Sequence, residues 1–190
     1  MRGKSLVSLA LILIVLASLV MANVGYAADP PNVYVDPDAP VFNPTEYFDV
    51  AIKVAGAPGI TGFEFKLKWN KNILEYPPAV TEGGFLKSAG ATEFRALGNF
   101  LESHMHVGCH LTSTVASPPS GDGTLATFKF YVLASGASDL TLFDVRLYDY
   151  ATGGLVPDVT TKDGHFQSTK PFVDFTWTPV SPELGEIATF

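Results

Sequence analysis

The chain has 190 residues, a formal net charge of −7 and a single cysteine, Cys109. Nucleic-acid binders carry clustered Lys and Arg in excess, and this acidic chain has no such cluster, so nucleic-acid binding is excluded as a predicted function. A lone cysteine also excludes an intramolecular disulfide, so the apolar core must hold the fold together.

Residues 1–27 have the features of a signal peptide. Arg2 and Lys4 precede an apolar run, Leu6–Ala22, and small residues follow it. This order predicts export to the outside of the cell or to its surface, with cleavage after Ala27 or Ala28. The 17-residue run also reaches the lower limit for spanning a bilayer, so an uncleaved anchor remains an alternative, and we predict no other membrane contact. Without the leader, 10 basic residues stand against 19 acidic ones, a net charge of −9.

The mature chain is predicted to open with two strands. Val33–Val35 is the first, and turns at Asp36-Pro37 and Asn43-Pro44 follow it. The second covers 47–54, where polar and apolar residues alternate. Period-two alternation is typical of a strand with one buried face.

The clearest strand is predicted over 62–69. Its apolar residues occupy every second position and are predicted to be buried: Phe63, Phe65, Leu67 and Trp69. Glu64, Lys66 and Lys68 alternate with them and are predicted to face water. The amides of Asn70 and Asn72 then favour a turn, and Ile73-Leu74 returns an apolar anchor beneath the sheet.

The rest of the chain is also predicted to be β. Residues 79–98 are irregular apart from a short strand at 94–97, and further strands are predicted over 102–111, 124–133 and 140–148, with a closing strand after Asp163. In the strand at 124–133, Leu125 and Thr127 lie on one face and Phe128 and Phe130 on the other, so both faces are predicted to be covered. No helix of ordinary length is expected. The predicted fold is an all-β, jelly-roll β-sandwich of about nine strands.

Several segments resemble, in order, those of the cohesin family of extracellular β-sandwich modules. They read GITGFEFKLKWNKNILEY from Gly59, GDGTLATFKFYV from Gly121 and DLTLFDVRLYDY from Asp139, with a last strand after Asp163. The resemblance covers 32–167 and defines a predicted domain at 28–168. It implies a non-catalytic module that docks a dockerin and so attaches or assembles proteins at a cell surface.

The last residues are predicted to open a second domain. Residues 171–190 read PFVDFTWTPVSPELGEIATF and resemble the start of a PKD (polycystic kidney disease) domain. Because about 20 residues cannot bury a core alone, we interpret 169–190 as a linker and a truncated second β-sandwich. The alternative is an ordered C-terminal strand of the first domain.

The resemblance implies that the partner docks on a flat sheet face formed by the strand at 62–69 and its neighbour at 103–111. Strand alternation independently places Glu64, Lys66 and Lys68 on the outside. The predicted partner-binding face combines these three residues with His104, His106 and His110, which lie on the outer side of their strand if the residues between them face the core. Met105, Val107, Cys109 and Leu111 are predicted to face the core. The neighbouring strand lacks the acids that are common in cellulosomal cohesins.

Metal binding is the alternative for the histidines. His104 and His106 have the His-x-His spacing that chelates zinc or copper, but His110 lies about 13 Å further along the strand, so solvent-facing histidines without metal are favoured. Loop aspartates offer a calcium site as a further alternative: Asp36, Asp38, Asp122, Asp158 and Asp163. The EF-hand spacing is absent, and we predict no cofactor.

No catalytic motif is present in the sequence, which lacks Gly-x-Ser-x-Gly, His-Glu-x-x-His and Walker patterns. We therefore predict a non-enzyme, although a glycosidase-like pair of acids stays open because any two acids could meet in the fold. Two alternatives to protein docking remain. The first is a carbohydrate-binding module linked to polysaccharide degradation, with Tyr47 and Tyr148 as exposed aromatic residues, and the second is a structural spacer or surface-layer component.

Overall fold

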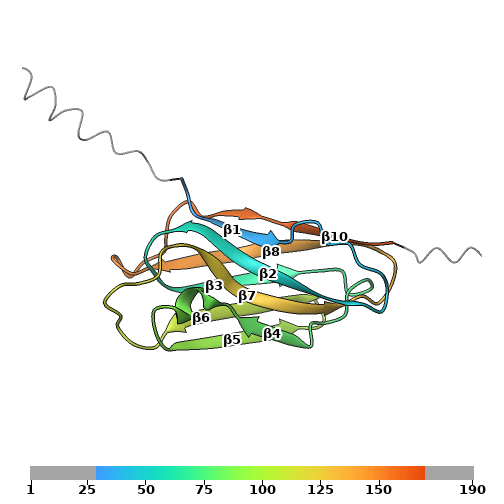
Figure 1. The fold of residues 1–190 in the computed structure, drawn as a ribbon, viewed down its shortest axis with the longest axis horizontal. Coiled ribbons are helices and arrows are strands. Elements are labelled where there is room, and N and C mark those ends of the chain that lie inside the picture. The colour runs from blue at the N-terminus through green and yellow to red at the C-terminus, as the bar shows by residue number, and fades with distance from the viewer. Residues whose placement is uncertain (1–28, 170–190) are drawn as a thin grey trace, which may run out of the picture.

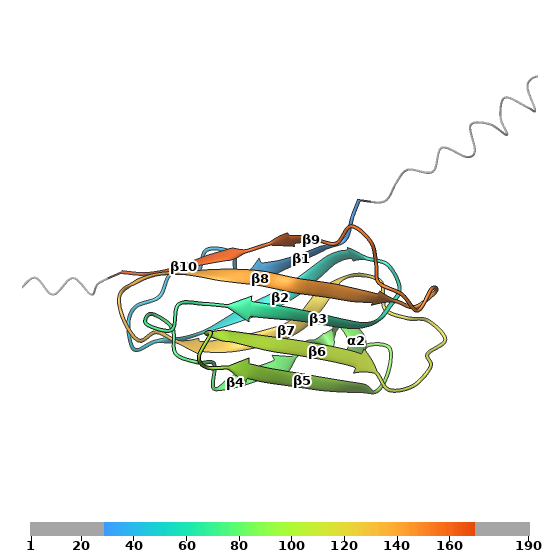
Figure 2. The ribbon, with the colours of Figure 1, turned by 180° about the vertical axis from the view of Figure 1, so that it is seen from behind.

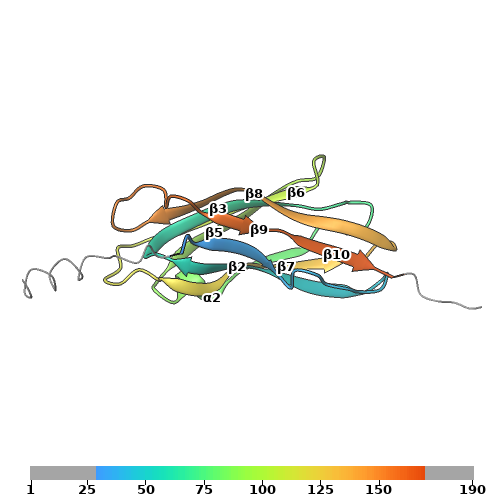
Figure 3. The same cartoon turned by 90° about the horizontal axis from the view of Figure 1, so that it is seen from above.

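The computed structural model describes residues 29–169. The predicted leader at 1–27 and the PKD-like segment from residue 170 onward lie outside the described residues. Two five-stranded sheets pack face to face as a sandwich (Figure 1 and, edge-on, Figure 3). Within residues 29–169, no helix is long and apolar enough to cross a membrane.

The first sheet has the strand order β4-β7-β2-β1-β9. Its strands are β1 (Asn32–Asp36), β2 (Tyr47–Ala57), β4 (Ala79–Glu82), β7 (Gly121–Tyr131) and β9 (Thr160–Lys162). All pairings are antiparallel except β1 with β9. Within β2, the apolar set Phe48, Val50, Ile52 and Val54 is buried, as the alternation predicts.

The second sheet has the order β10-β8-β3-β6-β5 and is fully antiparallel. Its strands are β3 (Ile60–Lys68), β5 (Thr92–Asn99), β6 (His104–Leu111), β8 (Gly136–Asp149) and β10 (Gly164–Ser168). A one-turn helix, α2 (Gly84–Lys87), connects β4 to β5. The all-β prediction is confirmed for residues 29–169, which form ten strands where about nine were expected.

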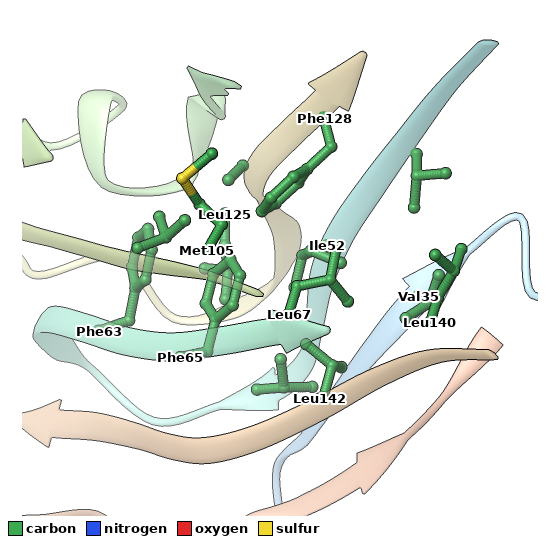
Figure 4. Close-up of a cluster of buried hydrophobic side chains, with 14 of the residues drawn as sticks. Val35, Ile52, Phe63, Phe65, Leu67, Met105, Leu125, Phe128, Leu140 and Leu142 are labelled. Carbon is green, nitrogen blue, oxygen red and sulfur yellow. The ribbon is translucent and has the colours of Figure 1, made fainter. Parts of the chain in front are cut away.

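One apolar core lies between the two sheets, and β3 supplies its centre. Phe63, Phe65, Leu67 and Trp69 are 0–3% exposed, so the predicted register of this strand is confirmed. The side chains of Phe63, Phe65 and Leu67 face Ile52 and Phe128 from the first sheet (Figure 4). Leu74, the predicted anchor, is also fully buried.

The prediction for the strand at 124–133 was partly wrong. Leu125 and Phe128 are both buried, although strict alternation along a strand would place them on opposite faces. The pairing of β2 with β7 explains this, because Ile52 pairs with Ala126 and Lys53 with Thr124, which leaves Leu125 as the extra residue of a β-bulge. The bulge returns Leu125 to the core side, and Lys129 on the other face is exposed.

Candidate functional site

The six predicted site residues come together on the outer face of the second sheet. The pairing of β3 with β6 places Lys66 opposite His106, Lys68 opposite His104 and Gly62 opposite His110. Glu64 lies opposite Gly108 in the same ladder. Figure 2 shows these two strands between β8 and β5, at the centre of the sheet.

Strands β8 and β5 complete this surface with residues that the sequence alone did not assign to it. The pairing of β3 with β8 places Tyr148 beside Gly62, Arg146 beside Glu64 and Phe143 beside Lys66. On the other side, β5 adds Glu93 beside His110, Arg95 beside Gly108 and Leu97 beside His106. We call the surface formed by the outward side chains of β8, β3, β6 and β5 the β3–β6 face.

Glu64 is the centre of a hydrogen-bonded network on the β3–β6 face. Arg146 donates to its Oε1, and the Nε2 atom of His106 lies 3.6 Å from Oε2. Desolvation raises the pKa of Glu64, but hydrogen bonds from Arg146 and Tyr148 and the nearby charges of Arg146 and His106 outweigh it, so its pKa lies below the ordinary value. Glu64 is therefore a carboxylate that is already neutralised within its own sheet.

Lys66 belongs to a second pair, which a bulge in β8 creates. Glu64 pairs with Arg146 and Lys66 with Phe143, so β8 has one extra residue here. Asp144 takes a positive φ of 51° at this bulge, and its Oδ2 accepts a hydrogen bond of 2.7 Å from Lys66 Nζ. The Lys66 ammonium also lies 5.5 Å from the centre of the Phe143 ring.

The expectation that all six side chains face open water was therefore wrong for three of them. The side chains of Glu64, Lys66 and His104 are only 21%, 29% and 13% exposed. Arg146 covers Glu64, and Phe143 packs edge-on against His104 with the ring centres 5.6 Å apart. Lys68 and His110 are exposed, as predicted.

A hollow of about 450 Å³ opens in the β3–β6 face at the end opposite Lys68. Its lining includes Gly62, Gly108, Glu64, Tyr148, Arg95 and Leu97. Leu97 is 64% exposed, the most exposed large apolar side chain within a strand of this sheet. The carboxylate of Glu93 accepts a 2.7 Å hydrogen bond from Arg95, which lowers the pKa of Glu93.

The metal alternatives find no support in the geometry. Among residues 29–169, no three His, Cys, Asp or Glu side chains gather as metal ligands. His104 lies beside Glu102 and His106 beside Glu64. Four of the five loop aspartates have separate partners, because Asp36 pairs with Lys53, Asp38 with Lys162, Asp122 with the Gly56 amide and Asp163 with the Leu142 amide.

Cys109 lies on the core side of β6, in a polar cluster between the sheets. Its thiol donates to Glu82 Oε1 at 3.4 Å, and the same oxygen accepts a 2.7 Å hydrogen bond from Thr92. Burial and the neighbouring Glu82 carboxylate raise the pKa of Cys109 to about 12. Because the thiolate is the reactive form, this cysteine is a poor nucleophile in the folded protein.

We predict that a disulfide reagent such as DTNB labels Cys109 very slowly in the native protein and rapidly in strong guanidinium. The reason is the combination of 4% exposure and an elevated thiol pKa. The measurement is the absorbance released at mildly alkaline pH. Complete labelling of the native protein at the rate of the unfolded chain would contradict the buried placement.

No protein-family model matches the sequence, and no curated protein gives a significant sequence match. Solved structures do match. A non-cellulosomal cohesin from the hyperthermophilic archaeon Archaeoglobus fulgidus matches with a TM-score of 0.58 and 23% identity, covering 74% of this chain and 91% of that one. A type II cohesin domain from the cellulosome of Acetivibrio cellulolyticus matches with a TM-score of 0.62 and 15% identity, covering 72% and 95%.

A third match is a chain of a type I cohesin–dockerin complex from Clostridium thermocellum, with a TM-score of 0.61 and 15% identity, covering 77% of this chain and 99% of that one. The predicted resemblance is thus confirmed at the level of the fold, which is a cohesin-like jelly roll.

Proposed function

We propose that this chain is an exported, non-catalytic binding module that docks a dockerin-like protein on its β3–β6 face. The observation that carries the proposal is the face itself, on which four neighbouring strands present aligned side chains around a hollow. Solved structures with the same fold include cohesins in complex with dockerins. Attachment or assembly of proteins at a cell surface is the role that follows.

The distribution of charge and apolar surface on this face suits a protein partner. The ion pairs of Glu64 with Arg146 and of Lys66 with Asp144 hold their side chains in place, so little side-chain freedom remains to be lost on binding. Leu97 adds an exposed apolar contact beside them. Preorganised polar groups around an apolar contact are the usual composition of a specific protein interface.

Carbohydrate binding remains a second candidate because of one feature on the opposite face. Tyr47 is 56% exposed and lies against Tyr131, with ring centres 4.7 Å apart, at the end of β2 and β7. A pair of accessible rings offers an apolar surface with hydroxyl groups at its edge. Tyr148, the other aromatic candidate, instead lies beside Glu64 in the β3–β6 face.

We predict that Leu97→Asp abolishes capture of a protein partner and leaves stability unchanged. An aspartate at this exposed position places an unpaired charge at the interface but disturbs no core contact. The measurement is capture from the native secretome on immobilised wild-type and variant domains, followed by binding of the identified partner in purified form. Leu133→Asp is the matched control, because Leu133 is 46% exposed and follows β7 in the first sheet.

A polysaccharide-retention gel run with the same proteins separates the alternatives. Retention on a polysaccharide by all forms, without a captured protein, would contradict docking and favour the carbohydrate-binding candidate at Tyr47. If the domain neither captures a protein nor is retained on a polysaccharide, the structural spacer is favoured.

A further inference from the structure

The hollow in the β3–β6 face exists because two central strands carry glycine at neighbouring positions. Gly62 of β3 and Gly108 of β6 form its floor, and larger side chains stand around them. Glycine weakens a strand interior, and it often marks a place where another molecule approaches the backbone closely. The presence of glycine at each of these two strand positions therefore needs a physical explanation.

Contacts within the domain explain the glycine at position 62 but not the glycine at position 108. A Cβ atom on Gly62 would lie 2.9 Å from the carbonyl oxygen of Cys109 and 3.3 Å from the Cβ of His110, so close approach of the two strands requires glycine there. A Cβ atom on Gly108 would meet nothing closer than the Phe63 carbonyl oxygen at 3.9 Å. A Cβ atom at position 108 would therefore meet no close contact, and it would stand at the lining of the hollow.

The charges around the hollow are already paired. Glu64 is neutralised by Arg146 and Glu93 by Arg95. A charged partner group entering the hollow would have to compete with one of these pairs and lose its own hydration. The backbone groups of the floor take part in the ladder between β3 and β6, and Leu97 contributes exposed apolar surface at the rim.

From this arrangement we infer that the partner inserts one uncharged, apolar side chain into the hollow above Gly108, and that the missing side chain at position 108 selects for this anchor. The inference rests on the proposed docking function and names the chemistry of its central contact. Buried apolar anchors surrounded by polar groups carry much of the binding energy of protein interfaces.

The chemistry of the occupant is tested without any protein partner. Three probes of nearly equal shape are titrated into the ¹⁵N-labelled domain: 3-methylbutan-1-ol, 3-methylbutanoate and 3-methylbutylammonium. The alcohol is expected to shift the amide signals of Gly62 and Gly108 in a saturable way, at millimolar affinity or weaker, whereas the two ions do not. Gly108→Val is expected to abolish the response. Thr127→Val, at an outward position of β7 in the other sheet, is the matched control and is expected to keep it.

A stronger response to either ion than to the alcohol overturns the inference, as does an unchanged response in Gly108→Val. The role as an anchor is tested with the partner captured by the wild-type domain. Gly108→Val is expected to lower its affinity about tenfold or more while the melting temperature stays the same or rises, because valine is favoured in strands. Full affinity in Gly108→Val would overturn the anchor and leave docking intact. If the alcohol binds in the hollow and the wild-type domain captures no protein, both the docking function and the anchor fail.

Discussion

Phe65→Ala is expected to lower the free energy of unfolding by about 3–5 kcal/mol, the usual cost of deleting a buried phenyl ring. Phe65 is fully buried on the central strand β3, and its ring centre lies 6.0 Å from that of Phe63 and 6.2 Å from that of Phe128. The ring therefore joins the two sheets, and its loss leaves a cavity that both sheets line (Figure 4). Urea unfolding followed by fluorescence measures the effect.

Lys68→Ala is the control for this prediction, since Lys68 is exposed on the same strand. Its free energy of unfolding is expected to stay within about 0.5 kcal/mol of the wild type. A larger loss in Lys68→Ala than in Phe65→Ala would mean that the strand is turned by one residue, which exchanges its two faces.

Glu64→Lys is expected to weaken partner binding about thirtyfold or more, equivalent to about 2 kcal/mol. The substitution places an ammonium beside the Arg146 guanidinium, so an attractive ion pair becomes a pair of like charges. Unlike a substitution at a fully exposed site, it should also cost about 1 kcal/mol of stability, because the Arg146 hydrogen bond is lost. Isothermal titration with the purified partner and thermal unfolding measure the two effects separately.

Asp49→Lys is the matched control for Glu64→Lys. Asp49 lies on the opposite face, in β2, where it pairs with Lys129 at 3.4 Å, so the reversal changes the net charge by the same amount. Partner affinity should be unchanged. An equal loss of affinity in both variants would indicate an effect of net charge and would contradict a localised contact at Glu64.

The acid limb of stability provides a further check on Glu64. The pKa of Glu64 in the folded protein lies below its ordinary value of 4.5. The ionised Glu64 side chain therefore contributes its full share of the folding stability above pH 4.5, and this share is lost as the pH falls through the lower pKa of the folded state. The difference in unfolding free energy between wild type and Glu64→Gln should therefore shrink as the solution is acidified below that value. A difference that grows on acidification would have the wrong sign.

Sequence alternation predicted the strands that bury one face and missed those that bury neither. Strands β2, β3 and β6 alternate clearly between core and solvent, and their registers were predicted correctly. Strand β9 reads Thr160-Thr161-Lys162 and is exposed throughout, so it carries no apolar period. In β5, an edge strand, Phe94 and Ala96 are only partly buried, which weakened the signal, and only its middle was predicted.

Half of the candidate site could be read from the sequence for the same reason. Alternation within β3 and β6 placed Glu64 and His106 on the outer side of their own strands, and the resemblance to the cohesin family supplied the pairing of the two strands. The alternation of residues along a strand does not reveal which strand lies beside it in the sheet. Arg146 and Tyr148 of β8 could therefore not be assigned to the site from the sequence. The bulge at Asp144 further shifts the register of β8, which the alternation of that strand does not show.

Docking on the β3–β6 face can be located by hydroxyl-radical footprinting of the partner-bound domain. Both faces carry exposed side chains that such radicals oxidise. Leu97 and His110 lie on the β3–β6 face, and Tyr47 lies on the other. If the partner docks there, bound partner protects Leu97 and His110 and leaves Tyr47 as reactive as in the free domain. Protection of Tyr47 with unchanged oxidation of Leu97 and His110 would contradict it.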